Sequence, residues 1–131
     1  MRISSQMPPE LEELAAKVVN AAYSVHKGLG PGLLESVYEI CMCHELSKAE
    51  IPFKRQVEMP IMYDNIRLDA GLRIDILINE KIVVELKAVE KMVPLYEAQL
   101  LTYLKLTGLK LGFLINFNVP LIKDGIKRIV R

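Results

Sequence analysis

Two apolar runs separated by three polar residues constrain the fold of this chain more than any other feature. Residues 66–78 end in Leu-Arg-Ile-Asp-Ile-Leu-Ile, and residues 82–89 read Ile-Val-Val-Glu-Leu-Lys-Ala-Val. Both runs have strand length and are rich in β-branched side chains, whereas residues 79–81 are polar. The pattern predicts an antiparallel hairpin with a three-residue loop, a common class in which Asn79 tolerates the unusual backbone angles.

The length of this loop decides which side chains meet. Alternate residues of a strand share a face, so Glu85 and Lys87 point the same way. A three-residue loop sets Asp75 directly opposite Glu85, whereas a two-residue loop would set Asp75 opposite Val84 and on the wrong face. We therefore predict the three-residue loop, or an equivalent bulge, with the carboxylates of Asp75 and Glu85 close together.

This arrangement has a definite chemistry. Directly opposed residues have Cβ atoms about 4.5–5.5 Å apart, so two buried carboxylates there must share a proton, pair with a cation or bind a metal ion. Oxygen ligands suit a hard ion such as Mg²⁺ or Mn²⁺. Lys87 can hold or deprotonate a water, or neutralise the charge that develops on a phosphate. The set predicts metal-dependent phosphodiester cleavage; ordinary ion pairs on a solvated face are the alternative interpretation.

Composition limits the class of protein. The chain has 131 residues, 51% of them hydrophobic and 25% charged, which fits a single globular domain spanning 1–131. The formal net charge of +1 means that any nucleic-acid binding must come from a local patch. The chain has no signal-peptide pattern, no membrane-length apolar run, and only two cysteines, which suit reduced thiols. We therefore expect a cytoplasmic protein without membrane contact.

The other elements follow from helical or alternating periodicity. Helices are expected at residues 9–27, 33–49 and 94–107, and strands at 53–62, 110–117 and 125–131. The strand at 53–62 and the two strands at 66–78 and 82–89 would form an antiparallel meander. The order strand, helix, strand that follows implies a parallel crossover.

Further polar residues lie at notable positions on the expected helices. Glu35 falls at the edge of the apolar arc of the second helix, and Glu39 falls further out. For Glu35 two interpretations stand: favourable placement near the positive helix terminus, or a third carboxylate aimed into the site. In the third helix Tyr96, Gln99 and Tyr103 share a face, which suits contacts to phosphate or a base, or else packing at the core margin.

Five blocks of this sequence, taken together, resemble one bacterial and archaeal family of small proteins. They are Gly32-Leu-Leu-Glu35-Ser-Val-Tyr38, which matches the GxxExxY signature, and then Arg73-Ile-Asp75, Glu85-Leu-Lys87, Ala98-Gln99-Leu-Leu-Thr-Tyr103-Leu-Lys-Leu-Thr-Gly108 and Gly112-Phe-Leu-Ile-Asn116-Phe117. The resemblance covers nearly the whole chain. The GxxExxY family is placed in the PD-(D/E)XK nuclease superfamily, whose members cut or process DNA with Mg²⁺.

The resemblance implies a fold and a site. The fold would be α/β (α+β), with a restriction-endonuclease-like αβββαβ core whose mixed sheet is flanked by helices. Asp75, Glu85, the carbonyl of Leu86 and Glu35 would hold Mg²⁺ or Mn²⁺, and Lys87 would be the catalytic lysine.

The resemblance also bears on the third helix. Gln99 with Tyr103 is similar to the Q-x-x-x-Y substrate-binding element of some relatives. Two positions depart from the pattern: Ile74 stands where the superfamily name has proline, and Tyr96 stands where many members have histidine.

These features together predict a Mg²⁺-dependent nuclease that acts on nucleic acid, with DNA as the expected substrate. The alternative is a catalytically inactive nucleic-acid-binding or protein-assembly module on the same fold. A chain this short, with no separate recognition domain, also raises a homodimer or a protein partner as a further expectation.

Overall fold

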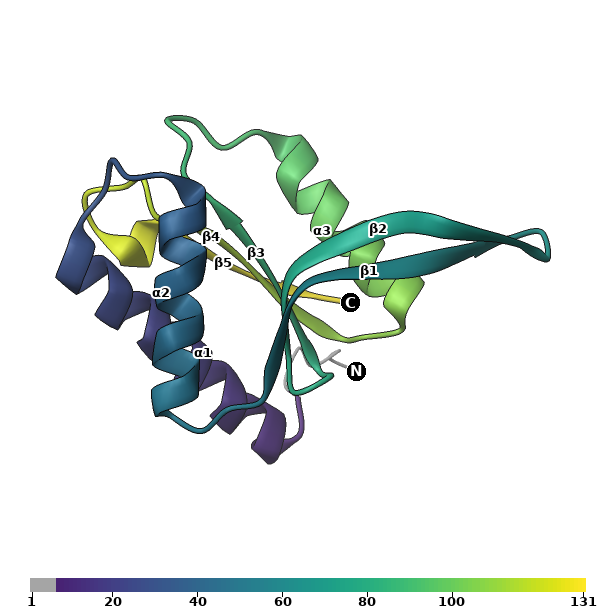
Figure 1. The fold of residues 1–131 in the computed structure, drawn as a ribbon, viewed down its shortest axis with the longest axis horizontal. Coiled ribbons are helices and arrows are strands. Elements are labelled where there is room, and N and C mark those ends of the chain that lie inside the picture. Colours follow the sequence, from purple (N-terminus) through teal and green to yellow (C-terminus); the bar gives the residue numbers. More distant parts are fainter. Residues whose placement is uncertain (1–6) are drawn as a thin grey trace, which may run out of the picture.

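The computed structural model describes residues 7–131 and has a five-stranded mixed sheet at its centre (Figure 1). Its elements, in chain order, are α1 (Pro9–Leu29), α2 (Glu35–Lys48), β1 (Phe53–Tyr63), β2 (Ile66–Ile78), β3 (Ile82–Lys87), α3 (Pro94–Thr107), β4 (Leu111–Asn116), the short 3₁₀ turn η1 (Ile122–Asp124) and β5 (Ile126–Val130). The strands lie in the order β1-β2-β3-β4-β5. Among the strands of residues 7–131, only β3 and β4 pair in parallel, and α3 connects them. The α+β fold predicted from the sequence, with its meander and its parallel crossover, is confirmed.

Helices cover both faces of the sheet, and the alternation along β3 shows which residues face which helix. Ile82, Val84 and Leu86 belong to the hydrophobic cluster formed with α1 and α2. Val83 belongs to the cluster formed with α3. Glu85 continues the alternation of Val83, so its side chain starts from the α3 face of the sheet.

The β1–β2 hairpin extends beyond the rest of the sheet. Strand β2 pairs with β1 from Ile66 to Ile78, but its registered pairs with β3 run only from Ile76 to Ile78. Figure 1 shows the two strands of the hairpin curving away as an arm, so that β2 leaves β3 after a short contact. The sheet therefore opens as a fork between β2 and β3.

The second helix begins two residues later than the sequence predicts. Gly32 has a φ of 98°, in the region that favours glycine, and Leu34 is extended with φ −73° and ψ 147°. This backbone cannot continue a helix, so α2 begins at Glu35. None of the helices within residues 7–131 has the length and hydropathy needed to cross a membrane.

Candidate active site

The loop between β2 and β3 has the predicted length of three residues. Ile78 pairs with Ile82, and Ile76 pairs with Val84. Asn79 and Glu80 adopt φ values of 50° and 56°. The N–H of Lys81 donates to the carbonyl of Ile78 at 2.9 Å, which closes the turn. Continuing this register by one residue sets Asp75 opposite Glu85.

At Asp75 and Glu85, side chains replace the strand-to-strand backbone bonds. The last registered pair of β2 and β3 is Ile76–Val84. Beyond it, the Asp75 carboxylate accepts a hydrogen bond from the N–H of Leu86 at 2.8 Å. The Glu85 carboxylate accepts one from the N–H of Asp75 at 3.2 Å. The two acidic side chains therefore lie in the fork where the strands separate.

The environment of Glu85 disfavours its negative charge. Its side chain is buried, with 6% of its surface exposed. Burial, followed by the nearby charge of Asp75, raises the pKa of Glu85 to about 8, although the charge of Lys87 acts in the opposite direction. A divalent cation between the two carboxylates would reverse this balance, because it stabilises both negative charges.

Lys87 lies beside this pair and is held by α3. Its Nζ atom lies 4.3 Å from the centroid of the Tyr96 ring, over the ring face. Within residues 7–131 the ammonium has no acidic side chain at ion-pair distance. An aromatic face attracts a cation without neutralising it, so the Lys87 charge remains available to a substrate.

Glu35, at the N-terminus of α2, lies near the same fork. Partial burial and then the charge of Asp75 raise the pKa of Glu35, whereas the charge of Lys87 lowers it. Both charges therefore act on this carboxylate. Glu35 also lies at the positive end of the helix dipole, which favours its negative charge.

Gly32 lies in the loop that precedes Glu35, and Tyr38 fixes the position of this loop. The Tyr38 hydroxyl donates to the carbonyl of Gly30 at 2.7 Å and accepts from the N–H of Leu33 at 3.1 Å. Its ring stacks on Phe117, with centroids 4.5 Å apart and an interplanar angle of 5°. Tyr38 thus ties the loop that precedes Glu35 to the core.

Gln99 and Tyr103 lie one helical turn apart on α3 and contact each other. The Gln99 amide donates to the Tyr103 hydroxyl at 3.1 Å. Tyr103 also lines a hollow of about 290 Å³ with residues of the β1–β2 hairpin, among them Leu72 and Arg73. Arg73 precedes Asp75 by two residues on β2, so this hollow lies along the part of β2 that leads to the fork.

The sequence prediction for Glu39 was wrong. Glu39 was expected on the outer side of α2, but only 6% of its surface is exposed. Its carboxylate accepts hydrogen bonds from Arg55 at 2.8 and 3.0 Å and from Gln56 at 2.7 Å. Helical periodicity alone cannot identify this site, because the partners come from β1.

The importance of Asn116 was also missed by sequence reasoning. Its side chain is buried and pairs with the backbone of Val89 in both directions, at 3.0 and 3.1 Å. It also accepts from the N–H of Asn118. Asn116 therefore fastens the segment that follows Lys87. Its place at the end of a run of buried apolar residues was the available signal, because a buried amide needs partners.

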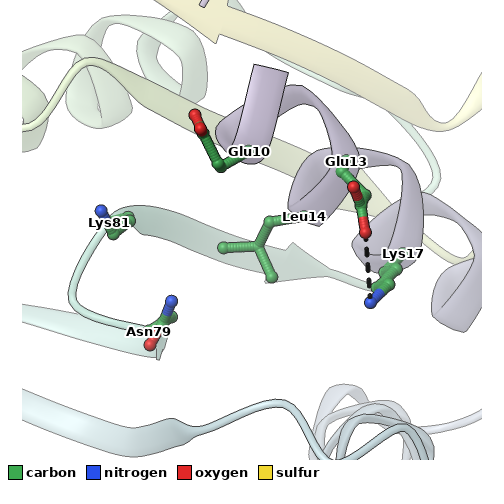
Figure 2. Close-up of a pocket in the computed structure, with 6 residues that line it drawn as sticks. All are labelled: Glu10, Glu13, Leu14, Lys17, Asn79 and Lys81. Carbon is green, nitrogen blue, oxygen red and sulfur yellow. Dashed lines mark ion pairs between the residues drawn. The ribbon is translucent and has the colours of Figure 1, made fainter. Parts of the chain in front are cut away.

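A separate hollow lies at the other end of β3, as Figure 2 shows. It has a volume of about 270 Å³ and is lined by α1 and the β2–β3 loop. Glu13 and Lys17 on α1 form an ion pair across 3.8 Å, with Asn79 and Lys81 on the facing loop. Its exposed charges are of both signs, and it does not belong to the candidate site.

The mixed sheet, its element order and its helices on both faces define a fold of the restriction-endonuclease-like class. The family model described as the PD-(D/E)XK nuclease superfamily matches residues 12–129, and the chain belongs to this superfamily. Membership indicates a nuclease and hence a nucleic-acid substrate. No curated protein and no solved structure matches the chain.

The donor atoms at the fork fit the divalent metal ion that the superfamily generally uses. Asp75 and Glu85 supply carboxylate oxygens, and their mutual repulsion favours a shared cation. The N–H of Leu86 faces Asp75, so its carbonyl, which points to the same side of an extended strand, also faces β2. Within residues 7–131 no three acidic, histidine or cysteine side chains are close enough to hold a metal by themselves.

Proposed function

We propose that this protein is a Mg²⁺- or Mn²⁺-dependent nuclease of the GxxExxY family that hydrolyses phosphodiester bonds in DNA. One observation carries the proposal: Asp75 and Glu85 occupy the fork between β2 and β3, with the unneutralised charge of Lys87 beside them. A buried glutamate paired with a half-buried aspartate, next to a cation without an acidic partner, is weak evidence for a purely stabilising role and suits phosphodiester chemistry.

The proposed metal ligands are Asp75, Glu85 and the Leu86 carbonyl, and Glu35 completes the set. When bound, the metal would activate a water for attack and neutralise charge on the phosphate. Glu35 is on a different element from the others, so its approach depends on how α2 is held against the sheet.

The side chains of the protein orient the substrate around this centre. The Lys87 ammonium donates hydrogen bonds to the scissile phosphate, or to the attacking water, and stabilises the charge that builds up in the transition state. Tyr96 restricts the positions that Lys87 can take. Gln99 and Tyr103, further along α3, contact the nucleic acid next to the scissile bond.

A second candidate function is a catalytically inactive module that binds nucleic acid or mediates assembly on the same fold. It is favoured by one observation: no three potential metal-binding side chains within residues 7–131 are gathered closely enough to hold an ion. In this case DNA binding would not depend on Mg²⁺ or on the acidic pair.

Cleavage assays separate the two candidates. Single- and double-stranded DNA, and RNA, would be incubated with the wild type in Mg²⁺, in Mn²⁺ and in a chelator. We expect metal-dependent cleavage that is lost in Asp75→Asn and in Lys87→Met. The controls are Asp69→Asn, an exposed aspartate on the same strand, and Lys48→Met, an exposed lysine of a surface ion pair.

The outcomes are distinct. Cleavage that survives both site substitutions contradicts the proposal and points to another site or a contaminant. DNA binding without cleavage, equal in the wild type and in Asp75→Asn, supports the inactive module. Circular dichroism on each variant establishes that loss of cleavage is not loss of the fold.

A further inference from the structure

The buried carboxylate of Glu39 joins α2 to β1 beside the acidic pair. One carboxylate oxygen accepts from Nε of Arg55 at 3.0 Å and from its terminal nitrogen at 2.8 Å. The other oxygen accepts from the Gln56 amide at 2.7 Å. Both oxygens of Glu39 are therefore engaged by neighbouring residues of a single strand. We call these three residues the Glu39 network.

Strand β1, which supplies the hydrogen-bond donors to Glu39, also pairs with the part of β2 that contains Asp75. Arg55 pairs with Ile76, and Val57 pairs with Ile74, so Gln56 stands opposite Asp75. Gln56 has a φ of 49°, which is uncommon for a residue other than glycine, asparagine or aspartate. This backbone conformation coincides with the hydrogen bond to Glu39, and it lies next to the residue proposed as a metal ligand.

Glu39 lies one helical turn after Glu35 on α2. Residues four apart lie on the same face of a helix, so anchoring Glu39 restricts the position of Glu35. Glu39 is bonded to Gln56, which stands opposite Asp75, so the N-terminal turn of α2 that carries Glu35 is held on the side of β1 that faces this part of β2.

We infer that the Glu39 network is a positioning device that directs the Glu35 carboxylate toward the metal site that Asp75 and Glu85 would form. The inference rests on the proposed function, because it assigns a purpose to Glu35 within that site. In this role Glu39, Arg55 and Gln56 are positioning residues that would act on the metal only through Glu35.

Glu39 and Arg55 have opposite charges, so substituting each of them separates an effect of charge from an effect of positioning. If charge alone mattered, Glu39→Gln would weaken Mn²⁺ binding, and Arg55→Gln would strengthen it by removing a positive charge. Positioning predicts that both variants weaken Mn²⁺ binding, because both release α2 from β1. Residues that orient metal ligands typically change affinity by about 10- to 100-fold, and we expect a loss of about tenfold in each variant.

A double-mutant cycle then separates action through Glu35 from a general effect. Mn²⁺ affinity would be measured by calorimetry for the wild type, Glu35→Gln, Glu39→Gln and the double variant. Positioning predicts that Glu39→Gln has almost no further effect once Glu35 is a glutamine. Additive losses overturn the inference, and so does tighter binding by Arg55→Gln.

Matched controls keep the test decisive. Glu45→Gln removes a half-buried acidic group from the same helix, one that pairs with Lys48, and should leave Mn²⁺ affinity unchanged. If Arg55→Gln does not fold, Gln56→Gly removes the third hydrogen bond while suiting the positive φ, and it should also weaken Mn²⁺ binding.

A wild type that binds no Mn²⁺, with or without DNA, overturns the proposed function and this inference with it. A wild type that binds Mn²⁺ but shows an additive cycle overturns this inference alone.

Discussion

The carboxylate of Glu85 accepts a hydrogen bond from the backbone N–H of Asp75, the residue opposite it across the fork, at 3.2 Å. In an ordinary hairpin the strand backbones would make such contacts with each other. Here the acidic pair replaces them, so one group of atoms contributes both to the fold and to the proposed chemistry. The protonation of Glu85 therefore links the stability of the protein to the state of its site.

The first prediction concerns stability against pH. Burial and the charge of Asp75 raise the pKa of Glu85 to about 8 in the folded protein, against the ordinary value of 4.5 in the unfolded chain. The folded state therefore binds the proton more tightly. The stability from this group is fully present below pH 4.5 and is lost as the pH rises through about 8.

Urea unfolding between pH 5 and pH 8, without divalent metal, measures this effect. We expect the free energy of unfolding to fall with pH, with a slope of at most about 1.4 kcal/mol per pH unit. Glu85→Gln, which mimics the protonated carboxyl, should remove most of the slope. A wild type as dependent on pH as this variant would show that Glu85 titrates normally.

The second prediction concerns divalent metal. Mn²⁺ competes with the proton for Glu85, so its stabilising effect should grow between pH 6 and pH 8. At a concentration one hundred times the Kd, a ligand that binds only the folded state adds about 2.7 kcal/mol to the free energy of unfolding. Thermal unfolding with Mn²⁺ should show this shift in the wild type and not in Asp75→Asn. An equal shift in both proteins would place the ion elsewhere.

The third prediction concerns Tyr38. Tyr38→Phe keeps the stack on Phe117 but leaves the Gly30 carbonyl and the Leu33 N–H without their partner. We expect a loss of about 0.5–1.5 kcal/mol in the free energy of unfolding, the usual net contribution of a hydrogen bond, because both backbone groups are only partly buried. Tyr23→Phe, at a tyrosine that is 45% exposed, is the control and should change stability little. Equal stability in both variants would mean that water replaces the hydroxyl.

The sequence predicted the hairpin and its register because local rules decide them. β-Branched runs define the two strands, and three polar residues define the loop, so the adjacency of Asp75 and Glu85 follows from counting. Glu39 was assigned to the wrong side of its helix because its partner, Arg55, comes from a strand that packs against the helix. Pairings between elements depend on tertiary packing, which no local periodicity contains.

Other features of the fold and of the candidate site also depend on tertiary packing and could not be predicted from the sequence. The curvature that opens the fork depends on how the β1–β2 arm leaves the sheet, which the alternation of side chains does not record (Figure 1). The role of Asn116 depends on Val89, in a segment without periodicity. The adjacency of Asp75 and Glu85 was predictable, whereas the contacts that Glu39 and Asn116 make were not.

The last prediction concerns the contact between Lys87 and Tyr96. The Lys87 ammonium lies 4.3 Å from the ring centroid, a cation–π contact worth about 0.5–1 kcal/mol at partly exposed sites. Tyr96→Phe keeps the ring face and should cleave DNA at nearly the wild-type rate. Tyr96→Leu keeps an apolar side chain but removes the ring, so Lys87 loses its preferred position. Because Lys87 is proposed to act in the transition state, we expect kcat to fall about twofold to fivefold while KM changes little. Steady-state cleavage kinetics on one DNA substrate measure both constants.

A fall in kcat for Tyr96→Phe equal to that for Tyr96→Leu would assign the effect to the hydroxyl instead. An increase in KM alone would make Tyr96 a substrate contact.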